Sequence, residues 1–190
     1  MMNDTNFTKI ETSRLILDAL TSDDVAAVFG FAGDDAVAGK CLMPYPYVIE
    51  DAENWVADCI VQNASGKKSL TWAIRNKEDN ALIGAIGLQI DRQNSNAELG
   101  YWIAKDFQNQ QFGREALDAV VAFAFDTCEF NRLWANVFTN NYPSITILEW
   151  SGFQPEGRMR EHKYHQFDKS FRDILIYGML KRDYDKRKPQ

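Results

Sequence analysis

Hydrophobic and polar positions alternate in three consecutive segments near the middle of the chain. Leu70, Trp72 and Ile74 follow a period of two, and segments 82–90 and 97–103 are apolar runs of strand length. Short polar turns at 77–80 and 94–96 separate these segments. Three strands joined by such turns predict an antiparallel meander.

Segments whose apolar residues recur with helical spacing lie before and after this meander in the chain. Capping residues at 21–24 and 50–53 predict two helix starts before it, and two more helices are expected around 112–125 and 143–150. Gly152 is placed to end the last of these. The apolar positions expected on the faces of the first three helices are Val25, Val28, Phe29, Ala32, then Trp55, Val56, Cys59, Ile60, then Leu117, Val120, Val121, Ala124 and Phe125.

The remaining apolar segments complete an alternating order of elements. Residues 14–17 and 133–138 are expected as strands, and 163–167 with 172–179 as a closing hairpin around 168–170. Residues 39–47 are an irregular aromatic loop. The order β–α–α–β–β–β–α–β–α–β–β predicts an α+β fold with a mixed sheet covered by helices, unlike a doubly wound parallel sheet.

Composition and charge narrow the class of protein. With 190 residues, of which 45% are apolar, the chain fits one domain with one substantial core. A net charge of -6 argues against nucleic-acid binding, which requires a basic face. The sequence has neither a secretory leader pattern nor a run long enough to cross a bilayer, so we expect a soluble, cytoplasmic protein without a membrane partner. The basic segment 181–188 is interpreted as a solvated terminus rather than a binding arm.

Cysteine and histidine are too sparse for a metal site. Cys41, Cys59 and Cys128 are far apart and odd in number, which predicts reduced thiols without a disulfide framework or a metal knuckle. His162 and His165 have no cluster of acids or cysteines beside them, and we expect both on the surface of the final hairpin. The sequence therefore predicts no metal.

The segment 98–117 carries the most specific chemical signal. It is expected to form a strand, a short polar loop and then the start of a helix. The first N–H groups of a helix have no partner within it and lie at the positive end of its dipole, which favours phosphate. Gly113 allows close approach of an anion to the backbone, and Arg114 adds a positive charge.

Three separated motifs together carry a resemblance to one protein superfamily. They are Glu11-Thr-Ser-Arg-Leu-Ile-Leu17, Glu98-Leu-Gly-Tyr-Trp102, and Asn141-Tyr-Pro-Ser144 followed by Ile147-Leu-Glu-Trp-Ser-Gly-Phe153. In this order they resemble the GCN5-related N-acetyltransferase (GNAT) superfamily, and most of all its branch of ribosomal-protein N-terminal acetyltransferases. The resemblance implies one domain over residues 10–181 with tails 1–9 and 182–190. It also implies a mostly antiparallel sheet with helices on both faces, whose fourth and fifth strands splay apart.

The resemblance also implies acetyl-CoA as the donor. The family's pyrophosphate loop, Gln/Arg-x-x-Gly-x-Gly/Ala, matches at Gln108 and Gly113, whereas Gln111 stands at the usual inner glycine. A side chain there is expected to crowd the phosphates or change the backbone conformation. Residues expected to bind the donor are Gln108, Gln110, Gln111, Phe112, Gly113 and Arg114 at the pyrophosphate, Tyr101, Trp102 and Ile103 along the pantetheine arm, and Asn141.

Two residues are the catalytic candidates. Glu98 is expected to act as general base through a water molecule, and a half-exposed structural glutamate is the alternative. Ser144 either protonates the leaving thiolate or caps the helix that begins near Pro143. Asn141 bonds the donor's arm or the chain near this helix start, and Tyr142 is a second candidate proton donor. Tyr45, Tyr47 and Trp55 either line the acceptor pocket or pack in the core.

The predicted activity is transfer of an acetyl group from acetyl-CoA to a primary amine. The acceptor is a protein or peptide N-terminal α-amine or a small cationic amine. Deprotonating an α-amine at pH 7 costs about 1 kcal/mol, against about 4.6 kcal/mol for a lysine side chain, so a single carboxylate base suits the α-amine. The alternative is a non-catalytic or weakly active CoA-binding module whose phosphate loop is degenerate. The chain is expected to be a monomer or a homodimer that pairs through an exposed last strand.

Overall fold

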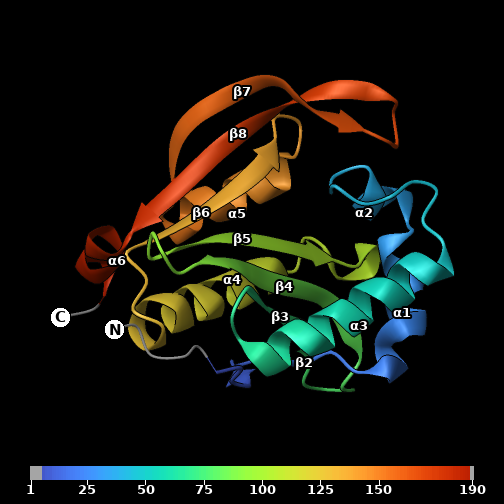
Figure 1. Ribbon diagram of the computed structural model, residues 1–190, viewed down its shortest axis with the longest axis horizontal. Coiled ribbons are helices and arrows are strands. Elements are labelled where there is room, and N and C mark those ends of the chain that lie inside the picture. The colour runs from blue at the N-terminus through green and yellow to red at the C-terminus, as the bar shows by residue number, and fades with distance from the viewer. Residues whose placement is uncertain (1–5, 189–190) are drawn as a thin grey trace.

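A mixed sheet of eight strands forms the centre of the protein. The computed structural model describes residues 6–188. In chain order the strands are β1 (Ile10–Glu11), β2 (Leu15–Ala19), β3 (Ser69–Asn76), β4 (Leu82–Asp91), β5 (Asn96–Ile103), β6 (Arg132–Phe138), β7 (Gln154–His165) and β8 (Ser170–Leu180). They lie in the order β1-β2-β3-β4-β5-β6-β8-β7 (Figure 1). Only the pair β5–β6 is parallel among the described strands, so the predicted mixed sheet is confirmed.

Helices cover both faces of this sheet. α1 (Val25–Ala32), α2 (Asp35–Ala38) and α3 (Ile49–Ser65) precede β3; α4 (Phe112–Ala122), with the π-helical turn η3 (Phe123–Thr127), and α5 (Tyr142–Ser151) flank β6; and α6 (Lys181–Arg187) follows β8. Buried residues of α1 and α3 form one apolar cluster, and those of α4 and α5 form another. The alternation of side chains along each strand supplies both clusters, since neighbouring residues point to opposite faces.

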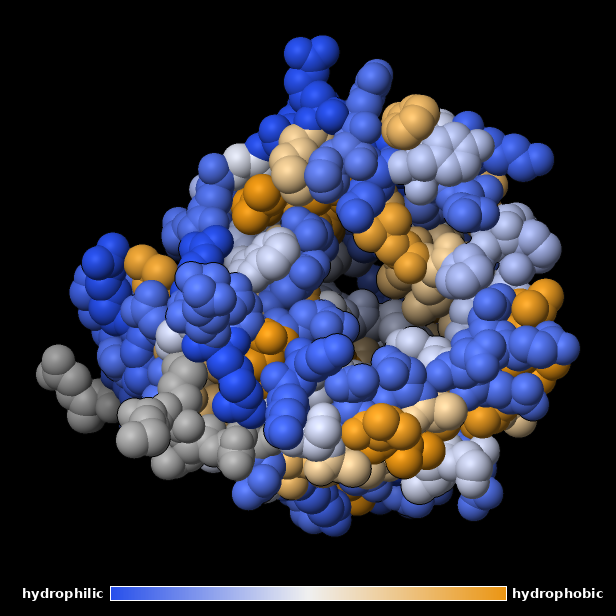
Figure 2. Space-filling model, viewed as in Figure 1, coloured by the Kyte–Doolittle hydropathy of each residue, from blue (hydrophilic) through white to orange (hydrophobic). Residues whose placement is uncertain are grey.

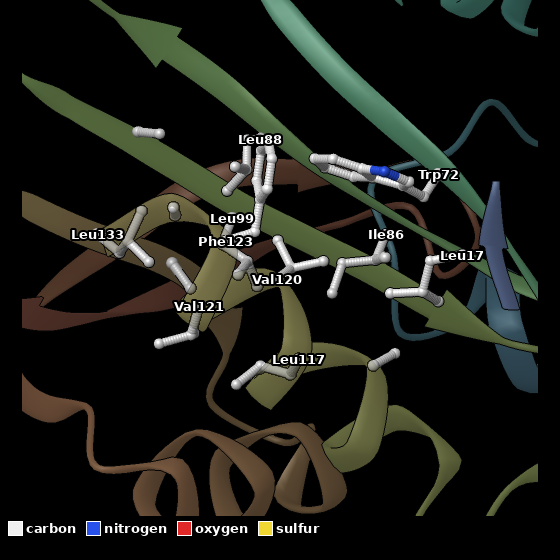
Figure 3. Packing of buried hydrophobic residues seen from close by; sticks show 14 of the residues in the cluster. Leu17, Trp72, Ile86, Leu88, Leu99, Leu117, Val120, Val121, Phe123 and Leu133 are labelled. Atoms are coloured by element: carbon white, nitrogen blue, oxygen red, sulfur yellow. The ribbon is translucent and has the colours of Figure 1, made fainter. Parts of the chain in front are cut away.

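The larger cluster lies between the strands and α4. Leu17, Ile86 and Leu99 from three strands face Leu117 and Val120 of the helix (Figure 3). These are positions that the period of two and the period of 3.6 place on one face of their elements. The core thus fixes α4, and with it the loop that leads into this helix.

Helix α3 differs from its predicted face. Val56 and Cys59 are buried as expected, but Ile60 is 41% exposed. The buried position one turn on is Asn63, whose side chain accepts from Thr71 N (2.8 Å) and donates to Thr71 O (2.7 Å). A paired amide can be buried at small cost because both of its polar atoms are hydrogen-bonded to the neighbouring strand.

The closing hairpin is longer than predicted, and its last strand is internal. β7 begins at Gln154 rather than at 163, and β8 lies between β6 and β7. The expectation of an exposed last strand is therefore wrong: β7 and β1 are the edges of the sheet. His165 is also not on the surface. It is 2% exposed, its Nδ1 lies 3.0 Å from Asp168 Oδ1, and its ring packs edge-on against Phe138.

Both predicted tails contribute contacts to the domain. The ring of Phe7 stacks on Trp72, whose indole N–H donates to Thr8 O (2.8 Å). Residues 181–187 form α6, whose Tyr184 stacks on Phe125. Tyr184 thus packs on the core, while the basic residues at 182 and 186–188 are exposed, as expected of a solvated segment. Residues 1–5 and 189–190 of these tails lie outside the described residues.

Three further structural observations concern residues 6–188. No helix in this range is both long and apolar enough to span a bilayer. The same residues contain no group of three or more His, Cys, Asp or Glu side chains arranged to hold a metal ion. The three cysteines are free thiols.

Candidate active site

The parallel strands β5 and β6 separate from each other in the middle of the sheet. Their pairing covers three residue pairs, from Asn96↔Arg132 to Glu98↔Trp134. β5 stays paired with β4 as far as Ile103, whereas β6 turns away with β8 (Figure 1). This confirms the splayed strands that the sequence resemblance implied.

The separation leaves alternate backbone groups of β5 facing the gap. Ala104 N donates to Ile83 O, so even-numbered residues of this regular antiparallel ladder bond to β4. The N–H and C=O groups of Leu99 and Tyr101 consequently point toward the gap. Trp102, also predicted to bind the donor, bonds to β4 instead, and its ring is buried among residues of α1 and α3. Of these two residues predicted to bind acetyl-CoA, Tyr101 is the one whose backbone N–H and C=O lie at the gap.

The loop after β5 leads to the N-terminus of α4. Gln108 donates its side-chain amide to Ile103 O (2.9 Å), and Gln110 donates to Asp106 O (2.9 Å). Both side chains were predicted to bind acetyl-CoA. In the structure each donates a hydrogen bond to a backbone carbonyl and so stabilises the loop itself. The first-turn N–H groups of Phe112, Gly113 and Arg114 have no partner within the helix.

Gln111 occupies a backbone conformation that glycine would adopt readily. Its φ is 64° and its ψ 8°, in the left-handed region, and it is the N-cap of α4. A side chain at this position was expected to crowd the phosphates or to change the backbone conformation. The structure shows that Gln111 keeps the left-handed conformation in spite of its Cβ. The strain of a non-glycine residue in this region is of the order of 1 kcal/mol.

Two cavities meet beside the gap. One of about 350 Å³ is lined by Glu98, Asn136 and Trp55. The other, of about 510 Å³, is lined by the loop residues 107–109 and 111–114 and by Trp150. Lys40, Cys41, Tyr101, Trp102, Asn141 and Ser144 line both cavities. In Figure 2 this side of the molecule is hollowed, with apolar residues on one side of the opening and polar residues along the rest of its rim.

Glu98 lies where the strands separate, on the sheet face that α1 and α3 cover. Its Oε1 accepts from Asn136 Nδ2 (3.0 Å). Burial raises the pKa of Glu98 above the ordinary value, while this hydrogen bond and the positive charge of Lys163 oppose the rise. A partly buried carboxylate with a raised pKa is suited to accept a proton near neutral pH.

Two hydroxyl groups lie at the junction of the cavities. Tyr101 Oη and Ser144 Oγ are 3.0 Å apart, and burial raises the pKa of Tyr101 to about 12. Ser144 does not cap α5; that role belongs to Asn141, whose Oδ1 accepts from Ser144 N (3.4 Å). Asn141 Nδ2 also donates to Lys40 O (3.3 Å). The seryl hydroxyl is therefore not used for capping, and it contacts Tyr101 at the site.

The other sequence candidates divide between the cavities and aromatic contacts outside them, and Tyr45 is 37% exposed. Trp55 lines the first cavity, and Tyr142, 71% exposed, lines the second. Tyr45 packs edge-on against Phe167, and Tyr47 stacks with Phe29. Sequence reasoning missed the Tyr101 hydroxyl, Asn136 and the Lys40–Cys41 segment. Asn136 comes from the strand across the gap and Lys40–Cys41 from an irregular loop, and the Tyr101 hydroxyl gains its role only by contact with Ser144, so the signal in each case is tertiary.

Comparison with known proteins gives concordant results. Residues 14–154 match the family model described as Acetyltransferase (GNAT) domain. The chain is 31% identical over 176 residues to the uncharacterized N-acetyltransferase YoaA of Bacillus subtilis (strain 168), covering 92% of this chain and 98% of that protein. It is 28% identical over 105 residues to the ribosomal-protein-serine acetyltransferase of Escherichia coli (strain K12), covering 55% and 57% of the two chains.

A solved structure has the same fold. RimL, a ribosomal L7/L12 α-N-protein acetyltransferase crystallised in complex with coenzyme A, superposes with a TM-score of 0.81 at 19% identity, covering 91% of this chain and 98% of that chain. The family match covers most of the chain and agrees with the splayed sheet and the free helix N-terminus. The chain belongs to the GNAT family of acetyltransferases.

Proposed function

We propose that the protein transfers the acetyl group of acetyl-CoA to the α-amine of a protein or peptide N-terminus. One observation carries the proposal: a partly buried carboxylate, Glu98, and a hydroxyl pair, Tyr101 and Ser144, border two cavities that meet at the splayed strands. An acetyl transfer between two molecules requires two entrances and a shared centre. The ribosomal-protein acetyltransferases among the relatives support the acceptor class.

The residues of the second cavity fit the donor. The first-turn amides of α4 and the charge of Arg114 provide a site for the pyrophosphate. The backbone N–H and C=O of Leu99 and Tyr101 provide partners for an extended amide-bearing arm, which would lie along β5 like an added strand. The Tyr101 N–H then lies where it can polarise the thioester carbonyl.

The first cavity supplies the base. The amine nitrogen forms a bond to the carbonyl carbon, and Glu98 takes the amine proton, either directly or through water. The carbon–sulfur bond then breaks. Ser144, linked to Tyr101, donates its proton to the departing thiolate and regains one from solvent, which also takes up the proton that Glu98 releases. A single carboxylate is sufficient for an α-amine, which loses its proton at a cost of about 1 kcal/mol at pH 7.

An acetylation assay with defined peptides tests this function. Peptides that begin with Ala or Ser and lack lysine are incubated with acetyl-CoA, and acetylated products are identified by mass spectrometry. We expect product at the N-terminus, and Glu98→Gln to lower kcat about a hundredfold with unchanged acetyl-CoA binding. Glu53→Gln, an exposed position on α3, is the matched control and is expected to keep wild-type activity.

Other acceptors are separate outcomes of the same assay. Acetylation of spermidine or an aminoglycoside, with no peptide product, would reassign the acceptor to small cationic amines. Wild-type turnover by Glu98→Gln at neutral pH would remove this carboxylate from the mechanism.

A further inference from the structure

The turn between β1 and β2 is attached to the first turn of α4. Glu115, in that first turn, accepts at Oε1 from Thr12 Oγ1 (2.6 Å), Ser13 Oγ (2.9 Å) and Arg14 N (2.9 Å). Its Oε2 accepts from Arg14 Nε (2.7 Å). Partial burial by itself would raise the pKa of Glu115, but these bonds hold it at about 2, so the group is a carboxylate.

Arg14 also contacts the phosphate loop directly. Its NH1 donates to Gln110 O (3.1 Å), and its guanidinium lies 4.4 Å from the centre of the Phe112 ring. A trans peptide holds its C=O and N–H on opposite sides. Fixing the Gln110 carbonyl toward Arg14 therefore turns the Gln111 N–H to the other side of the loop. Gln111 is the strained left-handed residue, so this peptide is the one that most needs an external support.

The charge of Arg14 matters as well. Glu115 places a carboxylate within one turn of the amides that would hold a pyrophosphate. An uncompensated carboxylate there would repel the phosphates and weaken the helix N-terminus as an anion site. The Arg14 guanidinium neutralises the Glu115 carboxylate and at the same time donates a hydrogen bond to the Gln110 carbonyl.

We propose that Arg14 is a positioning residue for the donor: it orients the Gln111 peptide and neutralises Glu115, so that the loop binds the pyrophosphate of acetyl-CoA. This inference rests on the proposed function. It gives a role to the Glu11-Thr-Ser-Arg-Leu-Ile-Leu17 motif, which the catalytic site does not use. Arg14 acts through the loop and touches no reacting atom.

Two donors separate this role from a general structural one. Acetyl-CoA carries the pyrophosphate, and acetyl-pantetheine lacks it. For Arg14→Met we expect KM for acetyl-CoA to rise about tenfold, the effect of losing a charged hydrogen bond, with kcat within about twofold of wild type. With acetyl-pantetheine, kcat/KM is expected to stay unchanged. Calorimetry of coenzyme A binding is expected to show the same tenfold weakening without any turnover.

Further variants separate the two parts of the role. Glu115→Gln in the Arg14→Met background removes the uncompensated charge and is expected to recover about threefold of the lost affinity. Arg14→Lys keeps the positive charge but cannot bond to the Glu115 carboxylate and the Gln110 carbonyl together. We therefore expect KM to rise about threefold for acetyl-CoA and not for acetyl-pantetheine. Lys77→Met is the matched control. Lys77 Nζ donates to Thr12 O (2.7 Å) in the same turn, and its loss is expected to leave both donors unaffected.

The outcomes decide between the inferences. Equal losses with both donors, or unchanged coenzyme A affinity in Arg14→Met and Arg14→Lys, would overturn the role of Arg14. A third outcome is weaker coenzyme A binding in Arg14→Met together with a wild-type protein that acetylates no amine. This outcome would support the role of Arg14 and contradict the proposed function.

Discussion

At the scale of single residues, the proposed role of Glu98 as general base predicts the pH range of the reaction. Burial removes water from the carboxylate and raises its pKa, and Asn136 and Lys163 restrain the rise. A base must be ionised to accept a proton, so activity is lost as the pH falls through the pKa of Glu98.

We therefore expect the acid limb of the kcat/KM profile to lie above the ordinary range of a glutamate. Asn136→Leu removes the hydrogen bond that favours the ionised form and should move this limb to higher pH. Steady-state rates between pH 4 and pH 9 at saturating acetyl-CoA measure both effects. An acid limb that stays at the same pH in Asn136→Leu would show that another group is titrating.

Gln111 is the second residue whose local conformation has a measurable consequence. Gln111→Gly relieves the left-handed strain, of the order of 1 kcal/mol, and opens the loop to the phosphates. We expect the dissociation constant of acetyl-CoA to fall by about threefold to tenfold. Thermal unfolding with a ligand series reports this change. Gln110→Gly, at the neighbouring loop position, is the control; an equal gain there would assign the effect to loop flexibility.

At the scale of elements, the start of α5 connects a helix cap to the rim of the site. Asn141 accepts from Ser144 N and donates to Lys40 O, so one side chain ends the strand-to-helix turn and holds the loop after α2. This loop contributes Lys40 and Cys41 to both cavities.

Asn141→Ala is expected to lower the free energy of unfolding by about 1 kcal/mol, the usual cost of losing an N-cap. Asn141→Asp keeps the accepting oxygen and loses only the donor to Lys40, so it is expected to lose less than half as much. Urea unfolding followed by far-UV circular dichroism compares the three proteins. Equal losses in both variants would mean that the contact with Lys40, rather than the cap, stabilises this region.

At the scale of the whole molecule, a buried ion pair joins the helical layer to the sheet. Arg75 on β3 donates to both carboxylate oxygens of Asp24 (2.9 and 2.8 Å), with 11% and 8% of the side chains exposed. Asp18 on β2 accepts from Arg75 Nε (2.7 Å) and is 31% exposed. Asp24 directly precedes α1, so this network sets where the α1–α3 layer begins on the sheet.

Breaking the inner pair leaves a buried guanidinium without its closest partner. Asp24→Asn is expected to cost about 3 kcal/mol, whereas Asp18→Asn, at the more exposed pair, is expected to cost about 1 kcal/mol or less. Although burial alone would raise it, the pKa of Asp24 is lowered by Arg75 and Thr21. The stability from Asp24 is therefore present above the ordinary aspartate pKa and lost as the pH falls below it. Wild type and Asp24→Asn should converge in urea unfolding at acid pH; a constant difference down to pH 2 would contradict this.

The amino-acid sequence by itself determined the kinds and order of the elements. Periods of two and of 3.6 are local properties, so the meander, the α4 and α5 helices and the mixed sheet follow from spacing alone. The segment 98–117 likewise predicts a strand, a loop and a helix N-terminus, which are local and place Glu98, Tyr101 and Gly113 near one another along the chain.

Only the tertiary structure decided what lies across the gap. The contact of Tyr101 with Ser144 and the bond from Asn136 to Glu98 join strands and helices that are far apart in sequence. The burial of His165 and the internal place of β8 depend on how the hairpin pairs with β6. Arg14 and Glu115, 101 residues apart, meet only because β2 and α4 pack on the same core. Side-chain periodicity shows which face of an element is buried, but the neighbour on that face is chosen by packing of the whole chain.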